Sequence, residues 1–247
     1  MLESFCPGRV QTGKELSCNI VCPDFTSFSG EALEWSLSRV TKGHFLSPAS
    51  DDAALYMTGC EPHSTNFGGT LLLSRRANTW AVLWYKAGVV TSRCHKVLLP
   101  DRREGLVCMC EDGGQGYLTI SLSFVDLRDP APNMRATKDD SPAFFTVGDS
   151  TITCGENSSD PAKPFSLDSG WIDRVTFGPR GLTVIASRGR RIMTPAEVQQ
   201  CLDEQDPAKP NPGINFFPKM HRYRIDFFFN GRTWKPTPRG AKAAAAL

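Results

Sequence analysis

Apolar and polar positions alternate along several short stretches of the chain, most clearly between Gly105 and Asp129. Residues 106–110 form a short apolar run, and residues 118–124 carry an apolar side chain at every second position, the period of a half-buried strand. The Gly-rich segment 111–116 between them predicts a hairpin turn, because glycine readily adopts positive φ. We therefore expect a central β-hairpin. The side chains expected to face the core are Leu118, Ile120, Leu122 and Phe124.

Other segments repeat this pattern over shorter lengths and are bounded by Gly, Pro, Asn or Ser. Many short strands separated by such turn residues indicate a single all-β domain, either a β-sandwich or a jelly-roll-like fold. Segment 29–40 fits a strand or an irregular helical turn, and the type of segment 51–57 stays open. The remaining expected strands are 16–22, 70–73, 79–86, 89–90, 96–99, 144–147, 151–154, 171–177, 182–186 and 223–229. Of these, 144–147 and 151–154 predict a hairpin with a turn over 148–150, and 171–177 and 182–186 predict a hairpin with a turn over 178–181.

One segment has the marks of a helix. Thr194 is a good N-cap, Pro195 suits the first helical position, and Glu197 completes a capping box with Thr194. An apolar helical face begins at Val198. The sequence therefore predicts one helix, over residues 194–204, in the C-terminal half of the chain.

The chain has 247 residues, of which 40% are hydrophobic, and this is enough to bury a sizeable core. We expect residues 66–230 to form the β-sandwich core, and residues 1–65 to add strands and loops that pack on it. Residues 231–247 are basic, and we expect them to be a disordered tail.

The net charge of +2 is close to neutral, but the basic residues from Lys219 onward are accompanied by a single acid, Asp226. Cations that hold phosphates, interleaved with aromatic rings that stack on bases, are typical of proteins that bind single-stranded nucleic acid. The alternative is a core strand with Arg side chains in water, since Ile225, Phe227 and Phe229 share one face. The candidate nucleic-acid contacts are Arg222, Arg224, Arg232, Trp234, Lys235 and Arg239, with Trp234 as the stacking residue.

The nine cysteines fit buried thiols or metal ligands in a reducing compartment, and disulfides in a secreted chain. Cys18, Cys22, Cys60 and His63 form two pairs that match a tetrahedral zinc site, which makes zinc the one candidate cofactor. A glycosylation sequon at Asn157 is compatible with secretion. The N-terminus lacks the apolar core of a signal peptide, so we expect a cytosolic protein unless a signal was removed.

No catalytic motif is present: the chain has no GxSxG, HExxH, P-loop or dinucleotide fingerprint. The four histidines are far apart in sequence and have no obvious nucleophile partner. Asp126 and Asp129 have the spacing of paired carboxylates, but we interpret them as caps of a strand end and its turn, with Arg128 as an ion-pair partner for Asp126. We therefore expect a protein without enzymatic activity.

The strand Gly-x-Leu-x-Ile-x-Leu that leads into Asp-Leu-x-Asp resembles a hallmark of the 30K superfamily of plant-virus cell-to-cell movement proteins. The motif of that family is a Leu-x-Asp at a strand end, followed at a distance by a Gly. Phe124 stands where the family has Leu, so the motif is intact only in the register of Leu127. The resemblance covers about residues 105–204. The motif residues are Asp126, Asp129, Gly178 and Gly181.

The resemblance implies a jelly-roll-like domain that binds single-stranded RNA without sequence choice, targets plasmodesmata and assists cell-to-cell transport. Its implied partners are single-stranded RNA, host proteins and further copies of the chain. Two other interpretations stay open: a secreted viral β-sandwich that binds host cytokines or chemokines, and an intracellular zinc-stabilised interaction protein. Free thiols would favour the movement protein, paired thiols the secreted binder, and metal release on thiol modification the zinc protein.

Overall fold

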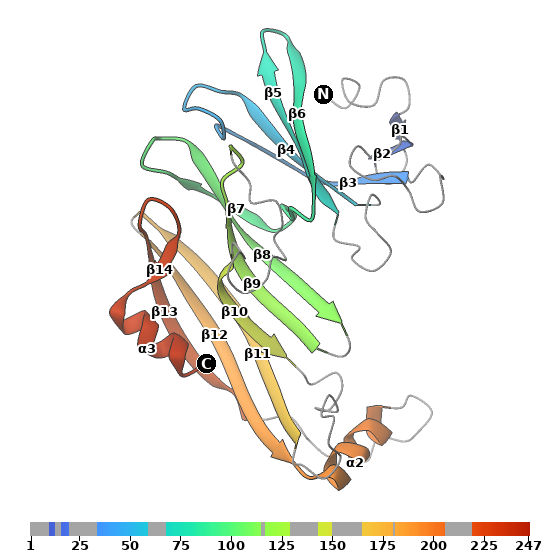
Figure 1. Cartoon of the computed structure of the whole chain (residues 1–247), viewed down its shortest axis with the longest axis vertical. Coiled ribbons are helices and arrows are strands. Elements are labelled where there is room, and N and C mark those ends of the chain that lie inside the picture. Colours follow the sequence, from blue (N-terminus) through green and yellow to red (C-terminus); the bar gives the residue numbers. More distant parts are fainter. Residues whose placement is uncertain are drawn as a thin grey trace. The chain divides into compact units, whose positions relative to one another are not determined.

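The computed structural model describes residues 10–12, 16–19, 34–58, 68–114, 117–128, 143–149, 165–179, 181–205 and 219–247. Within these residues the chain forms three antiparallel sheets and two helices (Figure 1). The prediction of an all-β fold with a helix in the C-terminal half is confirmed.

The first sheet has six strands in the order β1-β2-β3-β4-β5-β6, so each strand pairs with its neighbour in sequence. Segments 29–40 and 51–57, whose type the sequence left open, contribute to β3 and β4. β4 and β5 are buried on both faces, which explains why their apolar residues run together without alternation. The strands are β1 (Val10–Thr12), β2 (Leu16–Asn19), β3 (Glu34–Gly43), β4 (Asp52–Thr58), β5 (Gly69–Arg76) and β6 (Thr79–Ala87).

The second sheet has the order β10-β9-β8-β7 and contains the expected central hairpin. Ile120 and Leu122 are buried as predicted, whereas Leu118 and Phe124 are half-buried. The expected turn over 148–150 is wrong, because β10 continues through Asp149; residues 151–154 lie outside the described residues. The strands are β7 (Cys94–Leu98), β8 (Glu104–Gly114), β9 (Tyr117–Val125) and β10 (Ala143–Asp149).

The third sheet has the order β11-β12-β13-β14. Its first two strands form the expected hairpin, in which Phe177 is opposite Leu182 and Gly178 is opposite Gly181. In β13 the residues alternate between exposed and buried, with Ile225 and Phe227 on the buried face. The strands are β11 (Phe165–Gly178), β12 (Gly181–Met193), β13 (His221–Phe229) and β14 (Trp234–Pro236).

The chain divides into two compact units, and β8 and β9 contribute residues to both. In the first unit, the ring of Phe45 and the side chains of Leu72, Leu106 and Leu127 belong to one fully buried cluster. In the second unit, aromatic rings fill the space beside β13. The first unit is Met1–Cys110 with Leu122–Ala143, and the second is Glu111–Ser121 with Phe144–Leu247.

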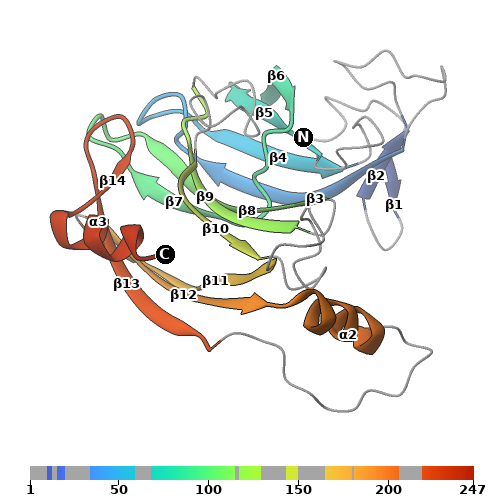
Figure 2. The ribbon, with the colours of Figure 1, turned by 60° about the horizontal axis from the view of Figure 1, so that its bottom comes forward.

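The predicted helix is α2 (Pro195–Gln205), which follows directly after β12 (Figure 2). Its capping box is confirmed: the Thr194 N–H donates to Glu197 Oε2 at 2.8 Å, and the Glu197 N–H donates to Thr194 Oγ1 at 3.3 Å. Val198 and Cys201 pack against buried residues at the far end of the β11–β12 hairpin.

The expectation of a disordered tail over 231–247 is wrong, because these residues form β14 and a second helix, α3 (Pro238–Ala245). Thr237 caps this helix by accepting the Gly240 N–H at 3.1 Å, and Pro238 occupies its first turn. β14 pairs only with residues 227–229 of β13, and α3 packs along the rest of that strand. The helix therefore covers an edge that would otherwise expose unpaired backbone groups.

Leu122→Asp tests the assignment of the core. The Leu122 side chain is 2% exposed, so the variant would bury an unpaired carboxylate at a cost of several kcal/mol, a large part of a typical domain stability of about 5–15 kcal/mol. We expect loss of cooperative melting by circular dichroism. Leu98→Asp makes the same change at a residue that is 74% exposed and should melt like the parent protein. A Leu122→Asp variant with unchanged melting would contradict the strand facing.

Candidate functional site

The Asp126 motif lies at the end of β9, where a buried arginine is its main partner. Arg103 Nη1 and Nη2 donate to the two carboxylate oxygens of Asp126 at 2.8 and 3.0 Å. Arg103 Nε donates to Asp101 at 2.7 Å, and Nη1 also donates to the carbonyl of Phe45 at 2.8 Å. The Arg103 side chain is only 4% exposed, so this buried cation has partners on three sides.

Asp126 also caps the turn that follows β9. Its Oδ1 accepts the backbone N–H of Arg128 at 3.0 Å, as the sequence predicted. The guanidinium of Arg128 is further away, at 4.0 Å from Oδ2, so Arg103 and not Arg128 is the principal ion-pair partner. Asp129 lies outside the described residues. Because the hydrogen bonds of Asp126 hold the fold, its carboxylate has a structural role here.

The ion pair fixes the charge state of both partners. Burial raises the pKa of Asp126, but the hydrogen bonds from Arg103 and from the Arg128 N–H lower it by more, and the result lies below the ordinary 3.8. The hydrogen bond to Asp126 raises the pKa of Arg103, so this arginine is charged at every pH at which the protein folds. The carboxylate is therefore ionised at neutral pH and is unsuited to general-acid chemistry.

A second buried carboxylate, that of Asp52, binds the segment that contains Phe45. The sequence did not single out this residue. Asp52 accepts the N–H groups of Phe45 and Leu46 at 2.8 and 2.9 Å. It also accepts the hydroxyls of Ser50 and of Ser74 on the neighbouring β5. Phe45 is thus bonded through its N–H to Asp52 and through its carbonyl to Arg103, while its ring is fully buried.

The motif glycines lie at the turn of the β11–β12 hairpin. A Cβ atom at Gly181 would lie 2.4 Å from the carbonyl oxygen of Phe227 on the neighbouring β13, a distance that no side chain tolerates. A Cβ atom at Gly178 would have only an ordinary contact, at 3.6 Å from the carbonyl oxygen of Gly181. Close strand packing therefore requires glycine at position 181, but not at position 178.

The third sheet presents a face that combines cations with exposed aromatic rings. Ile185 of β12 is opposite both Arg174 and Arg224, and Ser187 is opposite both Trp171 and Arg222. Directly opposed residues point to the same side of a sheet, so these rows share one face. Phe228 is opposite Lys235 and has the parity of Arg222 and Arg224. We call this surface the cationic sheet face. Its members are Trp171, Arg174, Arg222, Arg224, Phe228 and Lys235.

The predicted nucleic-acid contacts are only partly brought together. Arg222, Arg224 and Lys235 lie on the cationic sheet face, whereas Arg232 lies in the turn before β14. Arg239 is in the first turn of α3. The pKa of Asp226 is lowered chiefly by the hydrogen bond from the Thr183 hydroxyl, and the charge of Arg239 contributes.

Trp234 does not suit the stacking role predicted for it. Its side chain is 6% exposed and packs against Phe144 and Phe229, at ring separations of 6.2 and 5.5 Å. The exposed rings on the sheet are instead Trp171 and Phe228, at 46% and 43% exposure. The alternating pattern of β13 and its pairing with β14 could have distinguished buried from exposed aromatic residues. Trp234 is opposite Phe229, and Phe229 has the parity of the core residues.

Two acids share the cationic sheet face and neutralise part of its charge. Asp173 lies 3.4 Å from Arg222 Nε, and Asp226 lies 3.1 Å from Arg224 Nε. Exposed ion pairs of this kind contribute little stability, so the arginines can exchange partners. Arg174 and Lys235 have no ion pair within the described part of the chain. The face therefore keeps an excess of positive charge.

The predicted zinc site cannot be traced in the structure. Cys22, Cys60 and His63 lie outside the described residues, and of Cys18 only the backbone in β2 is described. Among the described residues, no group of three or more His, Cys, Asp or Glu side chains is arranged to hold a metal ion. Within the same residues, no helix has the length and apolar composition that crossing a bilayer requires.

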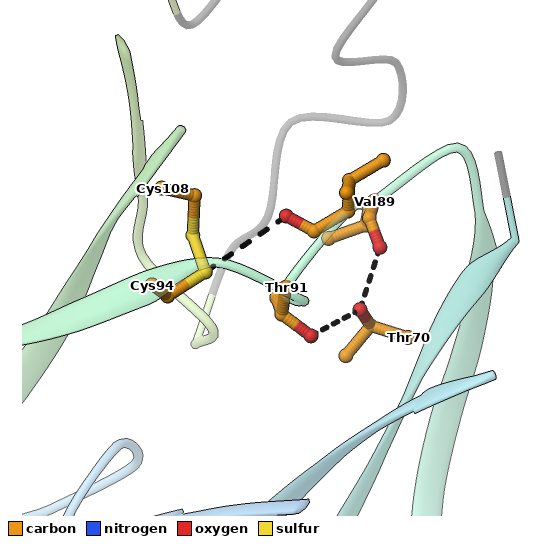
Figure 3. The surroundings of a disulfide bond; sticks show 6 residues. Thr70, Val89, Thr91, Cys94 and Cys108 are labelled. Carbon is orange, nitrogen blue, oxygen red and sulfur yellow. Dashed lines mark hydrogen bonds between the residues drawn. A yellow bond between two sulfur atoms is a disulfide. The ribbon is translucent and has the colours of Figure 1, made fainter. Parts of the chain in front are cut away.

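A disulfide links β7 to β8 within the first unit. Cys94 and Cys108 are directly opposite in register, and their sulfur atoms are bonded at 1.99 Å (Figure 3). Nearby, the Thr70 hydroxyl donates to the carbonyl of Val89 at 2.6 Å and lies 2.8 Å from the hydroxyl of Thr91. Cys108 is fully buried and is paired, so it is not a free core thiol. Cys201 is also disulfide-bonded.

Comparison of the chain with protein-family models, with curated proteins and with solved structures found no match.

Asp126→Asn and Asp126→Ala separate hydrogen bonding from charge. Asn keeps one oxygen for Arg103 and Arg128 but sets an N–H against the guanidinium, so we expect a loss of about 1–3 kcal/mol. Ala leaves a buried cation without its bidentate partner, and we expect a loss of about 3–5 kcal/mol. Urea unfolding at neutral pH measures both. Asp51→Asn, at an exposed ion pair with Arg75, is the matched control and should change stability little.

The same series predicts a pH dependence. Asp126 has a lowered pKa in the folded protein, so its contribution to stability is complete above the unfolded value of 3.8 and is lost as the pH falls through the folded value. The parent protein should lose this contribution on acidification, and Asp126→Asn should not. Equal acid sensitivity of the two proteins would contradict the ion pair with Arg103.

Proposed function

We propose that the chain binds single-stranded RNA without sequence choice on the cationic sheet face. The observation that carries the proposal is the exposure of Trp171 and Phe228 on the side of the sheet that bears Arg174, Arg222, Arg224 and Lys235. Single-strand binding proteins combine cations that neutralise phosphates with aromatic rings on which bases stack.

The dimensions of the face suit a short stretch of strand. Arg222 and Phe228 are six residues apart on β13, which corresponds to about 20 Å at 3.3–3.4 Å per residue. All six members of the cationic sheet face are exposed, so none of them forms a buried donor or acceptor set that would select one base. Recognition through phosphate charge and ring stacking is therefore independent of sequence.

The transport role belongs to this proposal only through the resemblance to movement proteins. That resemblance implies that the bound RNA passes between cells through plasmodesmata. In the structure, the hydrogen bonds of Asp126 and the close packing at Gly181 account for these two motif residues by their part in the fold. The cationic sheet face supports RNA binding independently of the motif.

The salt dependence of RNA binding tests the proposal. Each phosphate contact on a single strand contributes about −0.7 to the slope of log K against log salt. The triple variant Arg174→Gln, Arg222→Gln, Arg224→Gln should therefore flatten the slope by roughly 2. Trp171→Ala should weaken binding by about 1–3 kcal/mol and leave the slope unchanged. Fluorescence anisotropy with a labelled single-stranded RNA that has a 5′-hydroxyl end measures both quantities.

A matched control removes the same charge elsewhere. Arg39, Arg76 and Arg93 are exposed in the first unit, and their triple replacement by Gln should leave affinity and slope unchanged. Equal effects of the two triple variants would show that only net charge matters, and the cationic sheet face would not be the site. Absence of RNA binding by the parent protein at low salt would overturn the proposed function itself.

A second candidate function is favoured by the disulfides. Paired cysteines persist in oxidising compartments and are rare in the cytosol. The Cys94–Cys108 bond therefore supports the alternative of a secreted β-sandwich that binds host cytokines or chemokines. On that proposal, the cationic sheet face would contact an acidic protein surface and not RNA.

The state of the Cys94–Cys108 pair provides the test between compartments. The protein from its natural source is alkylated without prior reduction and examined by mass spectrometry. If the Cys94–Cys108 pair is oxidised, we expect both residues to be unmodified. The bond closes a loop with a sequence separation of 14, so its loss through Cys94→Ala and Cys108→Ala should cost about 3 kcal/mol. A reductant should lower the melting temperature of the parent protein more than that of this double variant. Complete alkylation of both thiols would favour the cytosolic RNA-binding protein.

A further inference from the structure

The turn that joins β13 to β14 contains the one Asn-Gly pair of the sequence, Asn230 followed by Gly231. Both residues are exposed, and a Cβ atom at Gly231 would meet nothing within 4 Å, so open space lies beside the peptide bond between them. Gly231 has a φ of +93°, which glycine adopts without strain. This peptide bond is therefore accessible to water and to the side chain of Asn230.

The Asn230 side chain folds back over the turn. Its Oδ1 accepts the backbone N–H of Arg232 at 3.0 Å and that of Thr233 at 2.8 Å. The ring that the first of these bonds closes includes the backbone nitrogen of Gly231, so the side-chain carbonyl carbon, Cγ, is held next to that nitrogen. Within the part of the chain that the structure describes, the side-chain nitrogen Nδ2 has no hydrogen-bond partner.

This arrangement has the parts of an intramolecular acyl transfer. The Gly231 nitrogen is the nucleophile, and its residue has no Cβ atom that would shield it. The two N–H donors polarise the carbonyl of Asn230 and stabilise the negative charge that develops on Oδ1 when the nitrogen adds, as an oxyanion hole does. Nδ2 is the leaving group, and no described contact holds it in place.

We propose that Asn230 is a site of spontaneous deamidation. The Gly231 nitrogen loses its proton to water and bonds to Cγ, while the electron pair of the carbonyl bond moves to Oδ1. When the carbonyl forms again, the bond between Cγ and Nδ2 breaks, and Nδ2 takes up a proton and leaves as ammonia. Water then opens the cyclic imide at either of its two carbonyl groups, which gives aspartate or isoaspartate at position 230. One water is consumed for each ammonia released, and no oxidant is needed.

The two products affect the turn differently. A turn role explains why asparagine and glycine occur here, and an aspartate would accept the same two N–H groups, so conversion to aspartate keeps the turn. Isoaspartate inserts a CH2 group into the backbone. Because β14 pairs with only three residues of β13, we expect isoaspartate to weaken this pairing.

Conversion also places a negative charge beside the cationic sheet face. Asn230 follows directly after β13, two residues beyond Phe228, and Phe228 is opposite Lys235. A carboxylate at this position would repel phosphate groups and compete with them for nearby cations. The effect on RNA binding rests on the proposed function, whereas the modification itself does not.

Peptide mapping by mass spectrometry tests the site. The full chain is incubated near neutral pH and digested with trypsin, and peptide 225–232 reports position 230. We expect this peptide to gain the mass difference between NH2 and OH. Asn78 is also exposed in a turn, but the β-branched Thr79 follows it, so it should stay unchanged. Gly231→Ala should slow the conversion by roughly tenfold or more, because the added methyl group hinders approach to the nitrogen.

Two outcomes would overturn the site. One is conversion of a synthetic peptide of residues 225–232 under conditions in which the folded protein stays unmodified. The other is equal conversion of Asn78 and Asn230, which would indicate hydrolysis without a contribution from the turn.

Fluorescence anisotropy with single-stranded RNA measures the consequence. Asn230→Asp should bind roughly twofold to fivefold more weakly than the parent protein at low salt. Asn78→Asp adds the same charge in the first unit and should bind like the parent. The parent should lose affinity during incubation, and Asn230→Gln should keep its starting affinity. Equal binding by the two Asp variants would overturn the effect on RNA. If Asn230 converts but the parent protein does not bind RNA, the modification site stands and the proposed function fails.

Discussion

The buried guanidinium of Arg103 is the constraint on which the first unit depends. A charge that is 4% exposed is very costly unless every donor finds a partner, and its partners come from three separate segments. Asp101 and Asp126 supply carboxylates, and Phe45 supplies a carbonyl 58 residues away in sequence. The network therefore fixes the end of β9 and the loop before β4 in one arrangement, and it also places the Phe45 ring in the core.

In the second unit, one side of the third sheet packs in the core and the other side stays exposed. Aromatic packing fills the inner side, where Phe144 and Phe145 meet Phe227 at centroid separations of 5.3 and 5.9 Å. α3 covers the unpaired part of β13, so the edge is protected without a further strand. The side that bears Arg222 and Arg224 takes no part in core packing and stays exposed.

Local patterns in the sequence predicted the elements that local physics determines. The alternation around Ile120 and Leu122, the β11–β12 hairpin and the Thr194 capping box are all confirmed, because each depends on neighbours in sequence. The start of α3 carries the same Thr-Pro signal at Thr237 but was missed, since a short basic segment at the end of a chain is typical of disorder. The Arg103 network and the Cys94–Cys108 bond depend on long-range contacts, and no single-sequence pattern reveals which distant residues meet.

The candidate sites show why a count of basic residues could not place them. In a strand the side chain alternates, so Arg222 and Tyr223, or Trp234 and Lys235, are neighbours in sequence but belong to opposite faces. The same composition therefore divides into a buried tryptophan and an exposed cationic face. Pairing register decides which cation can reach which ligand, and register follows from the buried parity of Ile225 and Phe227. A binding experiment on this protein distinguishes the two faces of the sheet only when each variant changes residues of one face. A change in net charge alone would affect both faces at once.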